Sequence, residues 1–530
     1  MINNNIKILT GKGGKYQLPA NMYDYMCLTS DRKLYINHAY STKAEVLNKI
    51  AYFKEAKLFD DKPILLSSNE IRAFYDLDTK NTQDTSQLQR EAIDLFKVAA
   101  SRNASDVHII VRKTESVIKM RITGDLIYYQ EGFTAAHGNA LCKTIFMTMC
   151  DQAGKTFQAK SRQDARMKSI YLPDGITGVR IGTSPTDSGY IFVCRLLKKY
   201  DSTKLNLDLL GYEDFQRELF NQAKSKKAGI NIFSGPTGSG KSTTMAIIVG
   251  VIISESAGSK HVLTAENPVE YEIGSTVSIT SQKDGKSFTK QIMSYATQTP
   301  IMGSNTRQTK DIFGDAIRSM MRLDPDVIMI GEIRDSGSLK AALDSSMTGH
   351  QVWTSVHATT AVGIITRVNM LGMEDNIQKE LICDANNISS LISQRLVKKV
   401  CPHCSELLIN HRHKVDKSLL ERLTKALNNC IHKVRLRNSN GCNKCDGGSI
   451  GRTVVAEIVL TDQKFMSLMI NSVYEAENYW LSKLNGVSMM MHGLLKVSRG
   501  EIDPTDLEDE LEYINLPEGV NMDYFKSLLK

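Results

Sequence analysis

The sequence predicts an α/β protein in which a parallel-sheet nucleotide-binding core follows an α+β domain and carries a small zinc module in its C-terminal part. Three observations point to this arrangement. Residues 235–242 read GPTGSGKS, a glycine-rich turn between a strand pattern and a helix pattern. Strand and helix patterns alternate from Leu205 onward, and two C-x-x-C pairs interrupt the C-terminal part of that alternation.

Length and composition set the broad class. A chain of 530 residues is too long for one hydrophobic core, so about three or four domains are expected. Its hydrophobic content of 42% and charged content of 23% are ordinary for a soluble globular protein. The formal net charge of +8 permits contact with anionic lipid or nucleic acid but does not require it.

No targeting or membrane-spanning segment is expected. The opening residues lack the basic stretch and apolar core of a secretory signal. The longest apolar run, Met245–Ile253, is about half of the roughly 18 residues that a span needs. These patterns predict a cytoplasmic protein, in which the 10 cysteines favour metal ligation over disulfides.

Residues 1–85 contain no chemical motif and are assigned to an N-terminal region that binds a partner. The segment Gly11–Lys15 has the residue types of a phosphate loop but not its spacing, so it is interpreted as a basic turn. The polar stretch Asp78–Gln87 is interpreted as a linker to the next domain.

An α+β domain is expected over residues 86–204. Apolar residues from Leu88 to Ala100 recur on one helical face, which predicts an amphipathic helix. A short linker, about Lys198–Asn206, joins this domain to the core at 205–530. Alternating apolar and polar residues predict three strands, Val107–Val111, Val117–Ile122 and Tyr190–Leu196.

The segment GPTGSGKS fits the phosphate-loop (P-loop) pattern G-x-x-x-x-G-K-[ST] at every fixed position. Its glycines let successive N–H groups face phosphate oxygens, its lysine reaches the β- and γ-phosphates, and its last hydroxyl ligates Mg²⁺. A strand pattern at Gly229–Ser234 and a helix pattern at Thr243–Ser254 supply the expected context. ATP is therefore a predicted ligand, with Mg²⁺ at Ser242. The residues assigned to nucleotide binding are Gly235, Pro236, Thr237, Gly238, Ser239, Gly240, Lys241, Ser242 and Thr243.

A carboxylate follows a second compact apolar run. Residues Val327–Ile330 suit a central strand buried on both faces, and Glu332 comes just after them. The C-terminal end of such a strand lies at the sheet edge that also carries the phosphate loop. Glu332 could therefore orient or deprotonate the water that attacks the γ-phosphate. The alternative is a solvated glutamate in a loop.

Four cysteines form two knuckles, CPHC at 401–404 and CNKC at 442–445. Each knuckle presents two thiolates, and four thiolates leave no free position, so a structural Zn²⁺ site is predicted. The gap between the knuckles has room for a helix at Lys417–Asn428 within a module over 398–455. A redox pair or unbound thiols are the alternatives. The predicted zinc ligands are Cys401, Cys404, Cys442 and Cys445; the remaining six cysteines are interpreted as mostly buried small residues.

Several motifs together resemble the ATPases of type II secretion and type IV pilus assembly. The resemblance covers roughly residues 88–515, and it leaves out residues 1–85 and the divergent segment 272–310. It implies a P-loop (RecA-like) core and a PAS-like domain before it. The matching segments are GEIRD (331–335, the Walker B box), ENPVEY (266–271, the acidic box, with Asn267 where the family usually has Asp), TGH (348–350) followed by SVHA (355–358), which together form the paired-histidine box, ASDVH (104–108), RITG (121–124), QDAR (163–166), VRIGTSPT (179–186), QRL (394–396) and GR (451–452).

The resemblance implies catalytic roles for further residues beside Glu332. The acidic-box residues Glu266 and Glu270 could hold Mg²⁺ through water or polarise the attacking water; helix-cap carboxylates are the alternative. His357 is implied to sense the γ-phosphate or to link hydrolysis to movement of the sheet. A satisfied core histidine is the alternative for that position.

Arginines outside the phosphate loop are also implicated. The family arrangement implies that Arg180 and Arg195, in the domain before the core, swing over the γ-phosphate as the domains close. Surface salt bridges are the alternative. Arg318 and Arg322 are expected one helical turn apart before the Glu332 strand, where they could line a subunit interface or cover the edge of the core.

The resemblance implies a homo-hexamer at the cytoplasmic face of the bacterial inner membrane. There ATP hydrolysis would power type IV pilus assembly, with the ring turning against an inner-membrane platform protein and contacting other components of that face. The N-terminal extension and the four-cysteine module favour assembly over retraction, because retraction members of the family are typically shorter and lack both. Departures from the family pattern at Asn267, Gly189-Tyr190 and His492-Gly493 favour a divergent branch, such as type IVb or plasmid-borne pili.

Three alternatives are weighed against this function. A type II secretion motor is the alternative within the family, since the core motifs do not separate the two roles. A DNA-transfer ATPase is disfavoured, because the cysteine knuckles lack an aromatic and basic stripe that could stack bases, so no nucleic acid is expected. A catalytically inactive ring is disfavoured by the intact Lys241 and Glu332.

Overall fold

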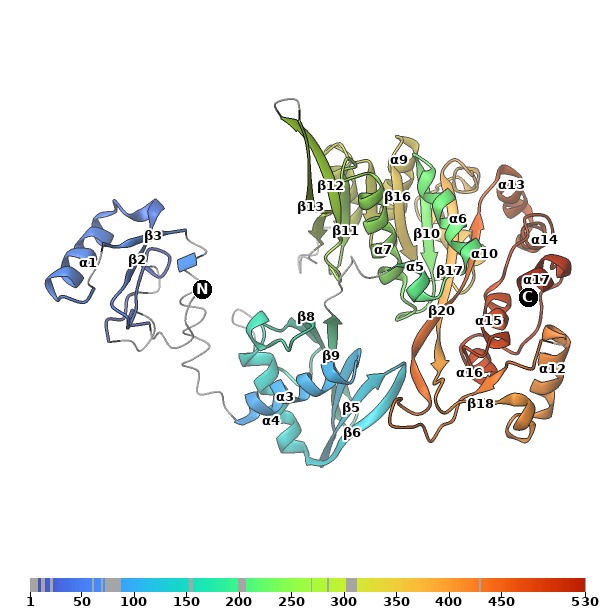
Figure 1. Ribbon diagram of the computed structural model, residues 1–530, viewed down its shortest axis with the longest axis horizontal. Helices are drawn as coiled ribbons and strands as arrows, with labels where there is room; N and C mark the ends of the chain where they lie inside the picture. Colours follow the sequence, from blue (N-terminus) through green and yellow to red (C-terminus); the bar gives the residue numbers. More distant parts are fainter. Residues whose placement is uncertain are drawn as a thin grey trace.

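The computed structural model describes most of the chain (Figure 1). Residues 11–14 of the expected basic turn, and 78–86 and 199–205 of the two expected linkers, lie outside the described residues, as do the side chains of 279–290. The described residues are 8–10, 15–19, 22–59, 62–67, 70–71, 87–151, 156–198, 206–267, 269–283, 286–301, 312–428 and 430–529.

A small sheet with strand order β1-β2-β3 packs with the helix Ala44–Glu55 near the N-terminal end of the described residues. Val46 and Phe53 on one face of the helix pack in a common core with Met26 and Leu28 of the first strand. The elements are β1 (Met26–Leu28), β2 (Leu34–Asn37), the 3₁₀ turn η2 (His38–Tyr40), α1 (Ala44–Glu55) and β3 (Ile64–Leu66).

A six-stranded antiparallel sheet follows, with order β6-β5-β4-β9-β8-β7. Phe96 and Phe146, from two helices, are buried against Ile109 and Phe192 of the strands, so both helices cover the same face. The opposite face carries exposed side chains such as Arg180. The elements are α3 (Gln87–Ser101), β4 (Asp106–Val111), β5 (Glu115–Ile122), β6 (Asp125–Thr134), α4 (Ala135–Thr148), β7 (Gln163–Arg166), the 3₁₀ turn η3 (Ser169–Tyr171), β8 (Ile176–Thr186) and β9 (Gly189–Lys198).

The predicted helix and the three predicted strands of this part are present, each longer than expected by one or two residues at an end. We propose that this sheet with its two helices is the α+β domain expected over 86–204. In this division the smaller sheet belongs to region 1–85, and residues 205–530 form the core domain with its module at 398–455.

The core domain contains a seven-stranded sheet with order β14-β11-β15-β16-β10-β17-β20. The pair β17–β20 is antiparallel, and the other neighbours are parallel. Parallel neighbours need crossover connections, which helices supply. The strands are β10 (Gly229–Ser234), β11 (Val262–Glu266), β14 (Thr297–Pro300), β15 (Val327–Ile330), β16 (Gln351–Val356), β17 (Ile388–Val400) and β20 (Ser449–Leu460), and the connecting helices are α7 (Lys241–Glu255), α8 (Ile312–Met320), α9 (Ser336–Met347), α10 (Ala361–Met373) and α11 (Lys379–Ile382).

The central strands β10, β15 and β16 are buried along their whole length, which explains their unbroken apolar character. On one face of the sheet, Phe233 and Trp353 pack against Ile248 of α7. On the other face, Ile328 packs in one core with Leu343 of α9. The sheet is therefore covered by helices on both sides (Figure 1).

The order of the strands decides which loops meet. Because β11, β15, β16 and β10 are parallel neighbours, their C-terminal ends lie at one edge of the sheet. The residues that follow these four ends are Asn267, Gly331, His357 and Gly235. The residues of the core that are predicted to bind or hydrolyse the nucleotide lie at these strand ends or in the segments that follow them.

Two helices, α5 (Leu207–Leu210) and α6 (Asp214–Ser225), precede the first core strand. A long hairpin of β12 (Gly274–Lys283) and β13 (Lys286–Tyr295) lies between β11 and β14 in sequence and projects beyond the sheet (Figure 1). Val277 at its base packs with α7. The hairpin falls within the divergent segment 272–310.

The predicted module is inserted between β17 and β20, and its helix has the expected start and ends one residue early. Five further helices follow β20. The inserted elements are β18 (Glu406–Leu407), the 3₁₀ turns η4 (Leu408–Asn410) and η5 (Arg412–Lys414), α12 (Lys417–Leu427) and β19 (Arg435–Leu436). The helices after β20 are α13 (Gln463–Asn471), α14 (Val473–Lys483), α15 (Met489–Ser498), α16 (Pro504–Glu510) and α17 (Met522–Leu528).

The helix before β15 is shorter than expected. α8 ends at Met320, so Arg322 lies in the following turn and not one helical turn beyond Arg318. The chain must reverse there to enter the sheet, and Asp324 adopts a left-handed φ of 53° in that turn. Arg318 pairs with Asp315 on the same helix at 2.7 Å.

Within the described ranges, no helix combines the length and the apolar character needed to cross a membrane.

Candidate nucleotide site and cysteine cluster

The glycine-rich loop lies between β10 and α7, as its sequence predicts. Gly235, Gly238 and Gly240 have φ values of +138°, +82° and +86°, a region that favours glycine. A Cβ atom on Gly235 would lie 2.4 Å from the carbonyl oxygen of Gln394. The loop therefore needs glycine at this position both for its backbone conformation and for its close approach to β17.

Two residues that are distant from the loop in sequence support it through hydrogen bonds. The Nε2 of Gln394 donates to the carbonyl oxygen of Ser239 at 2.7 Å. The hydroxyl of Tyr212 donates to Oε1 of Gln394 at 2.7 Å and lies 3.4 Å from Oγ1 of Thr244 in α7. No role is predicted for either side chain from the sequence, although Gln394 belongs to the matching segment QRL.

Lys241, the first residue of α7, folds back over the loop. Its Nζ donates to the carbonyl oxygens of Gly235 at 2.8 Å and Pro236 at 3.1 Å. Burial lowers the pKa of Lys241, and the negative charges of Glu332 and Glu270 oppose that shift. The cation thus lies within electrostatic reach of both predicted carboxylates.

The remaining residues of the loop differ in their exposure to solvent. Pro236, Thr237 and Gly238 are exposed at the tip of the loop, whereas Ser239 is buried. Ser242 is half-buried in the first turn of α7. In the same turn, the hydroxyl of Thr243 lies 2.9 Å from that of Tyr271, which ties the helix start to the acidic-box segment. The loop tip and the first turn of α7 therefore face the edge where the other site residues gather.

Glu332 lies in the turn after β15, at the same edge. The Oγ of Ser355 donates to the carbonyl oxygen of Gly331 at 2.7 Å, which fixes this turn against β16. One carboxylate oxygen of Glu332 accepts from Nε of Arg334 at 2.9 Å, and the other lies 3.2 Å from Nε2 of His357. Its side chain keeps 21% exposure, enough for access from solvent.

The two acidic-box residues differ in environment. Glu266, at the end of β11, is buried and accepts from Thr264 Oγ1 at 2.6 Å and Gln298 Nε2 at 2.8 Å. Burial raises the pKa of Glu266, and these hydrogen bonds limit the rise. Glu270 is half-buried nearby. Asn267, the departure from the family pattern, is half-buried directly after β11.

The structure separates the two histidines of the paired-histidine box. His350 precedes β16 and His357 follows it, so the two lie at opposite edges of the sheet, about 20 Å apart by strand geometry. His350 Nδ1 lies 3.0 Å from the carbonyl oxygen of Ser345, at the edge away from the loop. His357 alone of the two is brought to Glu332.

The predicted arginines lie on the six-stranded sheet, in one register row. Arg180 pairs with Arg195 across β8 and β9, Arg195 pairs with Asp106 on β4, and Arg180 pairs with Arg166 on β7. Directly opposed residues share a face of a sheet. All three arginines are exposed, and Arg195 donates to the buried Asp106 at 3.1 Å. Arg121 extends the row on β5.

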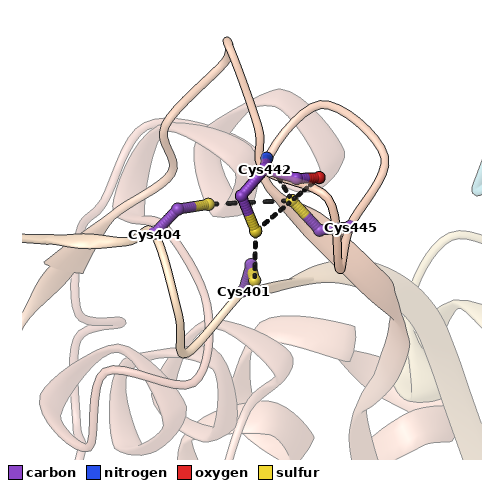
Figure 2. A group of neighbouring side chains, drawn as sticks. All are labelled: Cys401, Cys404, Cys442 and Cys445. Carbon is purple, nitrogen blue, oxygen red and sulfur yellow. Dashed lines mark hydrogen bonds between the residues drawn. The ribbon is translucent and has the colours of Figure 1, made fainter.

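The four predicted zinc ligands converge in the inserted module (Figure 2). All four sulfur atoms lie within 4.8 Å of one another. The Cys401–Cys442, Cys404–Cys445 and Cys442–Cys445 sulfur distances are 3.9, 3.7 and 3.6 Å. A tetrahedral ion with Zn–S bonds of about 2.3 Å places sulfurs about 3.8 Å apart, whereas a disulfide needs about 2.05 Å. The cluster therefore fits a tetrahedral zinc ion.

The family comparison covers most of the chain. Residues 81–512 match the family described as "Type II/IV secretion system protein". This span includes the six-stranded sheet, the seven-stranded sheet and the cysteine module, and it ends just after α16.

Two curated relatives illustrate the similarity. The chain is 29% identical over 427 residues to the type II secretion system protein E of Pseudomonas aeruginosa, covering 80% of this chain and 75% of that protein. It is 31% identical over 423 residues to the type IV pilus assembly ATPase PilB of Thermus thermophilus, covering 79% of this chain and 42% of that protein.

Among solved structures, the Legionella pneumophila ATPase DotB is similar in fold, with a TM-score of 0.52 at 19% identity. The match covers 81% of this chain and 96% of that one. At this identity the likeness concerns the fold alone.

Proposed function

The chain belongs to the type II/IV secretion system protein family and is an ATPase, and from this premise we propose that it is a motor that hydrolyses ATP to power type IV pilus assembly. The proposal rests on the residues that gather where the parallel strands of the seven-stranded sheet have their C-terminal ends. There the glycine-rich loop with Lys241, the carboxylate of Glu332 and the imidazole of His357 follow three neighbouring strands.

In the proposed site, the nucleotide phosphates lie against the glycine-rich loop and the first turn of α7. The N–H groups of the loop and the positive end of the helix favour anionic oxygens. Lys241 would exchange its two carbonyl partners, Gly235 and Pro236, for phosphate oxygens. Ser242, half-buried in that first turn, would ligate Mg²⁺.

The environments of Glu332, Glu266 and Glu270 suit these carboxylates to different roles in hydrolysis. Glu332, with 21% exposure and a contact to His357, is suited to orient and deprotonate the attacking water. Glu266 is buried and already accepts two hydrogen bonds, so it is suited to hold the edge of the Mg²⁺ site through water and less suited to take a proton from substrate. Glu270 is half-buried and keeps room for a water-mediated contact.

The arginine row supplies positive charge from outside the core. We propose that Arg180 and Arg195 approach the γ-phosphate when the two sheets close on a nucleotide. The charge that develops in the phosphoryl-transfer transition state makes such arginines effective. Arg195 is oriented by Asp106, whereas Arg180 is exposed next to it on the same face.

We propose that the four cysteines hold one structural Zn²⁺ and that the module supports the motor without taking part in chemistry. We further propose a homo-hexamer at the cytoplasmic face of the inner membrane, turning against a platform protein, with residues 1–85 bound to another assembly component. The similarity to a pilus assembly ATPase at 31% identity supports the pilus role.

A type II secretion motor is the second candidate. The similarity to a type II secretion protein E, at 29% identity and with higher coverage of that relative, favours it specifically. A DNA-transfer ATPase is a weaker candidate, because the cysteine knuckles lack an aromatic and basic stripe that could stack bases.

The test is surface piliation in a host whose chromosomal copy carries Glu332→Gln. The substitution keeps the shape of the side chain and the nucleotide loop but removes the carboxylate, so turnover should fall by roughly 100-fold or more. Loss of pili with undiminished nucleotide binding is the expected result. Piliation and protein export are scored in the same strains.

The other outcomes separate the candidates. Excess pili that do not retract would identify a retraction motor, and normal pili with failed protein export would identify a type II secretion motor. Wild-type turnover in the purified variant would show that Glu332 is not the catalytic carboxylate. Arg334→Gln, which removes the neighbouring contact but keeps the carboxylate, is the matched control.

A further inference from the structure

Glu457 is a carboxylate buried in the core domain that takes no part in the nucleotide site itself. It lies on β20, directly opposite Ser393 of β17, and is 6% exposed. One carboxylate oxygen accepts from the backbone N–H of Ala361 at 2.5 Å. The other accepts from the backbone N–H of Met489 at 3.2 Å. Burial of a carboxylate is costly unless hydrogen bonds replace those to water, and here each of the two oxygens accepts one.

Both donors belong to helix starts. Ala361 is the first residue of α10, and Met489 is the first residue of α15. The first N–H groups of a helix have no partner within it, and the positive end of the helix attracts an anion. A single carboxylate thus satisfies one N–H group from each of two helices that are 96 and 32 residues away from it in sequence.

The start of α10 lies only four residues after the proposed catalytic histidine in the chain. β16 ends at Val356, His357 follows, and α10 begins at Ala361. Within this short connection the Oγ of Ser393 donates to the carbonyl oxygen of Thr359 at 3.3 Å. The connection is therefore held by the sheet at one end and by Glu457 and Ser393 at the other, with His357 between them.

The position of His357 matters because its Nε2 lies 3.2 Å from Glu332. Displacement of a catalytic group by about 1 Å can cost about 100-fold in rate. Only four residues, 357–360, connect β16 to α10. A displacement of the first turn of α10 therefore also displaces His357.

We propose that Glu457 is a positioning residue for ATP hydrolysis, which acts by fixing the start of α10 and thereby holding His357 against Glu332. The inference rests on the proposed function, because it takes His357 and Glu332 as part of the hydrolysis site. It assigns to β20 a function in catalysis although this strand lies at the far edge of the sheet from β15.

The chemistry of the side chain explains why glutamate is needed. A carboxylate offers an acceptor oxygen to each of the two N–H groups, whereas an amide offers one oxygen and turns an NH₂ donor toward the other helix. Burial raises the pKa of Glu457 to about 7, the two N–H donors oppose the rise, and the charges of Glu477 and Arg395 act on the group from α14 and β17.

The experiment measures kcat and nucleotide affinity for full-length Glu457→Gln, His357→Ala and the double variant. For Glu457→Gln we expect kcat to fall roughly 10- to 100-fold, because His357 loses its alignment. The affinity for a fluorescent ATP analogue should change by less than about twofold, because the glycine-rich loop is untouched. In the His357→Ala background, Glu457→Gln should lower kcat no further.

Glu477→Gln is the matched control, since it removes a neighbouring half-buried carboxylate and leaves both helix starts in place. Its kcat should stay at the wild-type value. Should Glu457→Gln fail to fold, Ser393→Ala replaces it: this variant removes the hydrogen bond to Thr359 and should also lower kcat, again with no further effect in the His357→Ala background.

Three results would overturn the inference. Glu457→Gln with wild-type kcat, equal losses in kcat and affinity, or losses that multiply in the double variant would each mean that Glu457 does not act through His357. Failure of the proposed hydrolysis site, on which the inference rests, looks different. In that case Glu332→Gln and His357→Ala leave kcat unchanged, whatever Glu457→Gln does.

Discussion

At the scale of single residues, Lys241 shows how the loop is arranged for an anion. Its ammonium group is partly removed from water and satisfied by two carbonyl oxygens of Gly235 and Pro236. A bond from the ammonium group to a phosphate oxygen joins two opposite charges, whereas its present bonds join a charge to a neutral carbonyl oxygen. In the proposed function, the exchange of carbonyl partners for phosphate oxygens therefore favours binding and also frees the loop backbone.

His492, one of the departures from the family pattern, is a buried neutral histidine in the structure. Its Nδ1 accepts from the backbone N–H of Ala456 at 2.9 Å and from Nε2 of Gln216 at 3.1 Å. The proton must then reside on Nε2, which faces Glu213 at 3.8 Å, too far for a hydrogen bond. Burial lowers the pKa of His492 to about 4, Glu213 opposes the shift, and Lys496 adds to it.

The lowered pKa predicts that acid destabilises the protein through His492. The unfolded chain binds a proton at this residue below about pH 6.5, whereas the folded chain does so only below about pH 4. Stability is therefore full above about pH 6.5 and falls as the pH drops from there toward 4, by about 2 kcal/mol at pH 5. Urea unfolding at pH 7.5 and pH 5, compared between wild type and His492→Asn, measures the loss.

The variant should lose about 2 kcal/mol less between the two pH values, because asparagine keeps an acceptor but does not titrate. Glu457, whose pKa is raised, changes stability in the opposite direction over part of this range, so the difference between variant and wild type is the informative quantity. The exposed His403→Asn is the control. Equal losses in wild type and His492→Asn would contradict the prediction.

At the scale of elements, α16 fastens the cysteine module to the core domain. Arg422 of α12 makes two hydrogen bonds to Glu508, at 2.9 and 2.8 Å. Arg437, which follows β19, makes two to Asp506, at 2.8 and 3.0 Å. Paired bonds between a guanidinium and a carboxylate fix orientation as well as distance. The two paired contacts thus anchor the module to α16, and the cysteine cluster joins the two knuckles within the module.

Loss of the cysteine cluster should destabilise this part alone. Replacing Cys401 and Cys404 by Ser removes two of four thiolates, so one bound zinc per chain should disappear. Because zinc binding contributes directly to folding, the module should become sensitive to protease, while the groups of the nucleotide site stay in place. Elemental analysis and limited proteolysis measure the two effects.

Cys430→Ser is the matched control, since Cys430 lies in the same module outside the cluster. It should retain zinc and protease resistance. An unmutated protein that is purified without chelator and contains no zinc would refute the proposal of a four-thiolate site.

At the scale of the whole molecule, the two large sheets meet at one described salt bridge. Asp125, at the start of β6, contacts Lys398 near the end of β17 at 2.7 Å. The register row with Arg180 lies on the open face of the six-stranded sheet. Motion of one sheet relative to the other as a rigid body could therefore bring the row toward a nucleotide, as domain closure does in other enzymes.

This arrangement predicts that Arg180→Ala lowers turnover without weakening nucleotide binding. An arginine that contacts the γ-phosphate in the closed state stabilises charge in the transition state, so kcat should fall roughly 100-fold or more while affinity in the open state changes little. Steady-state ATPase kinetics and equilibrium binding of an ATP analogue measure the two quantities.

Two further variants serve as controls for this measurement. Arg112→Ala, which breaks an exposed ion pair with Glu115 at the other end of β4, should leave both quantities unchanged. Lys241→Ala should abolish binding itself. If Arg180→Ala retains wild-type kcat, the arginine row does not contribute to hydrolysis.

The sequence alone determined the parts of this protein whose geometry depends on neighbouring residues. The spacing of Gly235, Gly240 and Lys241 requires a curled loop between a strand and a helix, and the structure has both elements there, with α7 two residues earlier than expected. The knuckles at 401–404 and 442–445 each fold as a local turn, and the requirement of one metal ion for four thiolates predicted that the two turns would converge. The apolar run before Glu332 likewise defined a buried strand.

Only the tertiary structure decided which distant groups meet. The sheet order brings the loop after β10 beside the turn after β15, and the register aligns Arg166 with Arg180 and Arg195. Gln394 supports a loop 155 residues earlier in the chain, and Glu457 joins the starts of two helices. These contacts depend on strand order and on packing between segments remote in sequence. A local pattern of residues carries no information about either.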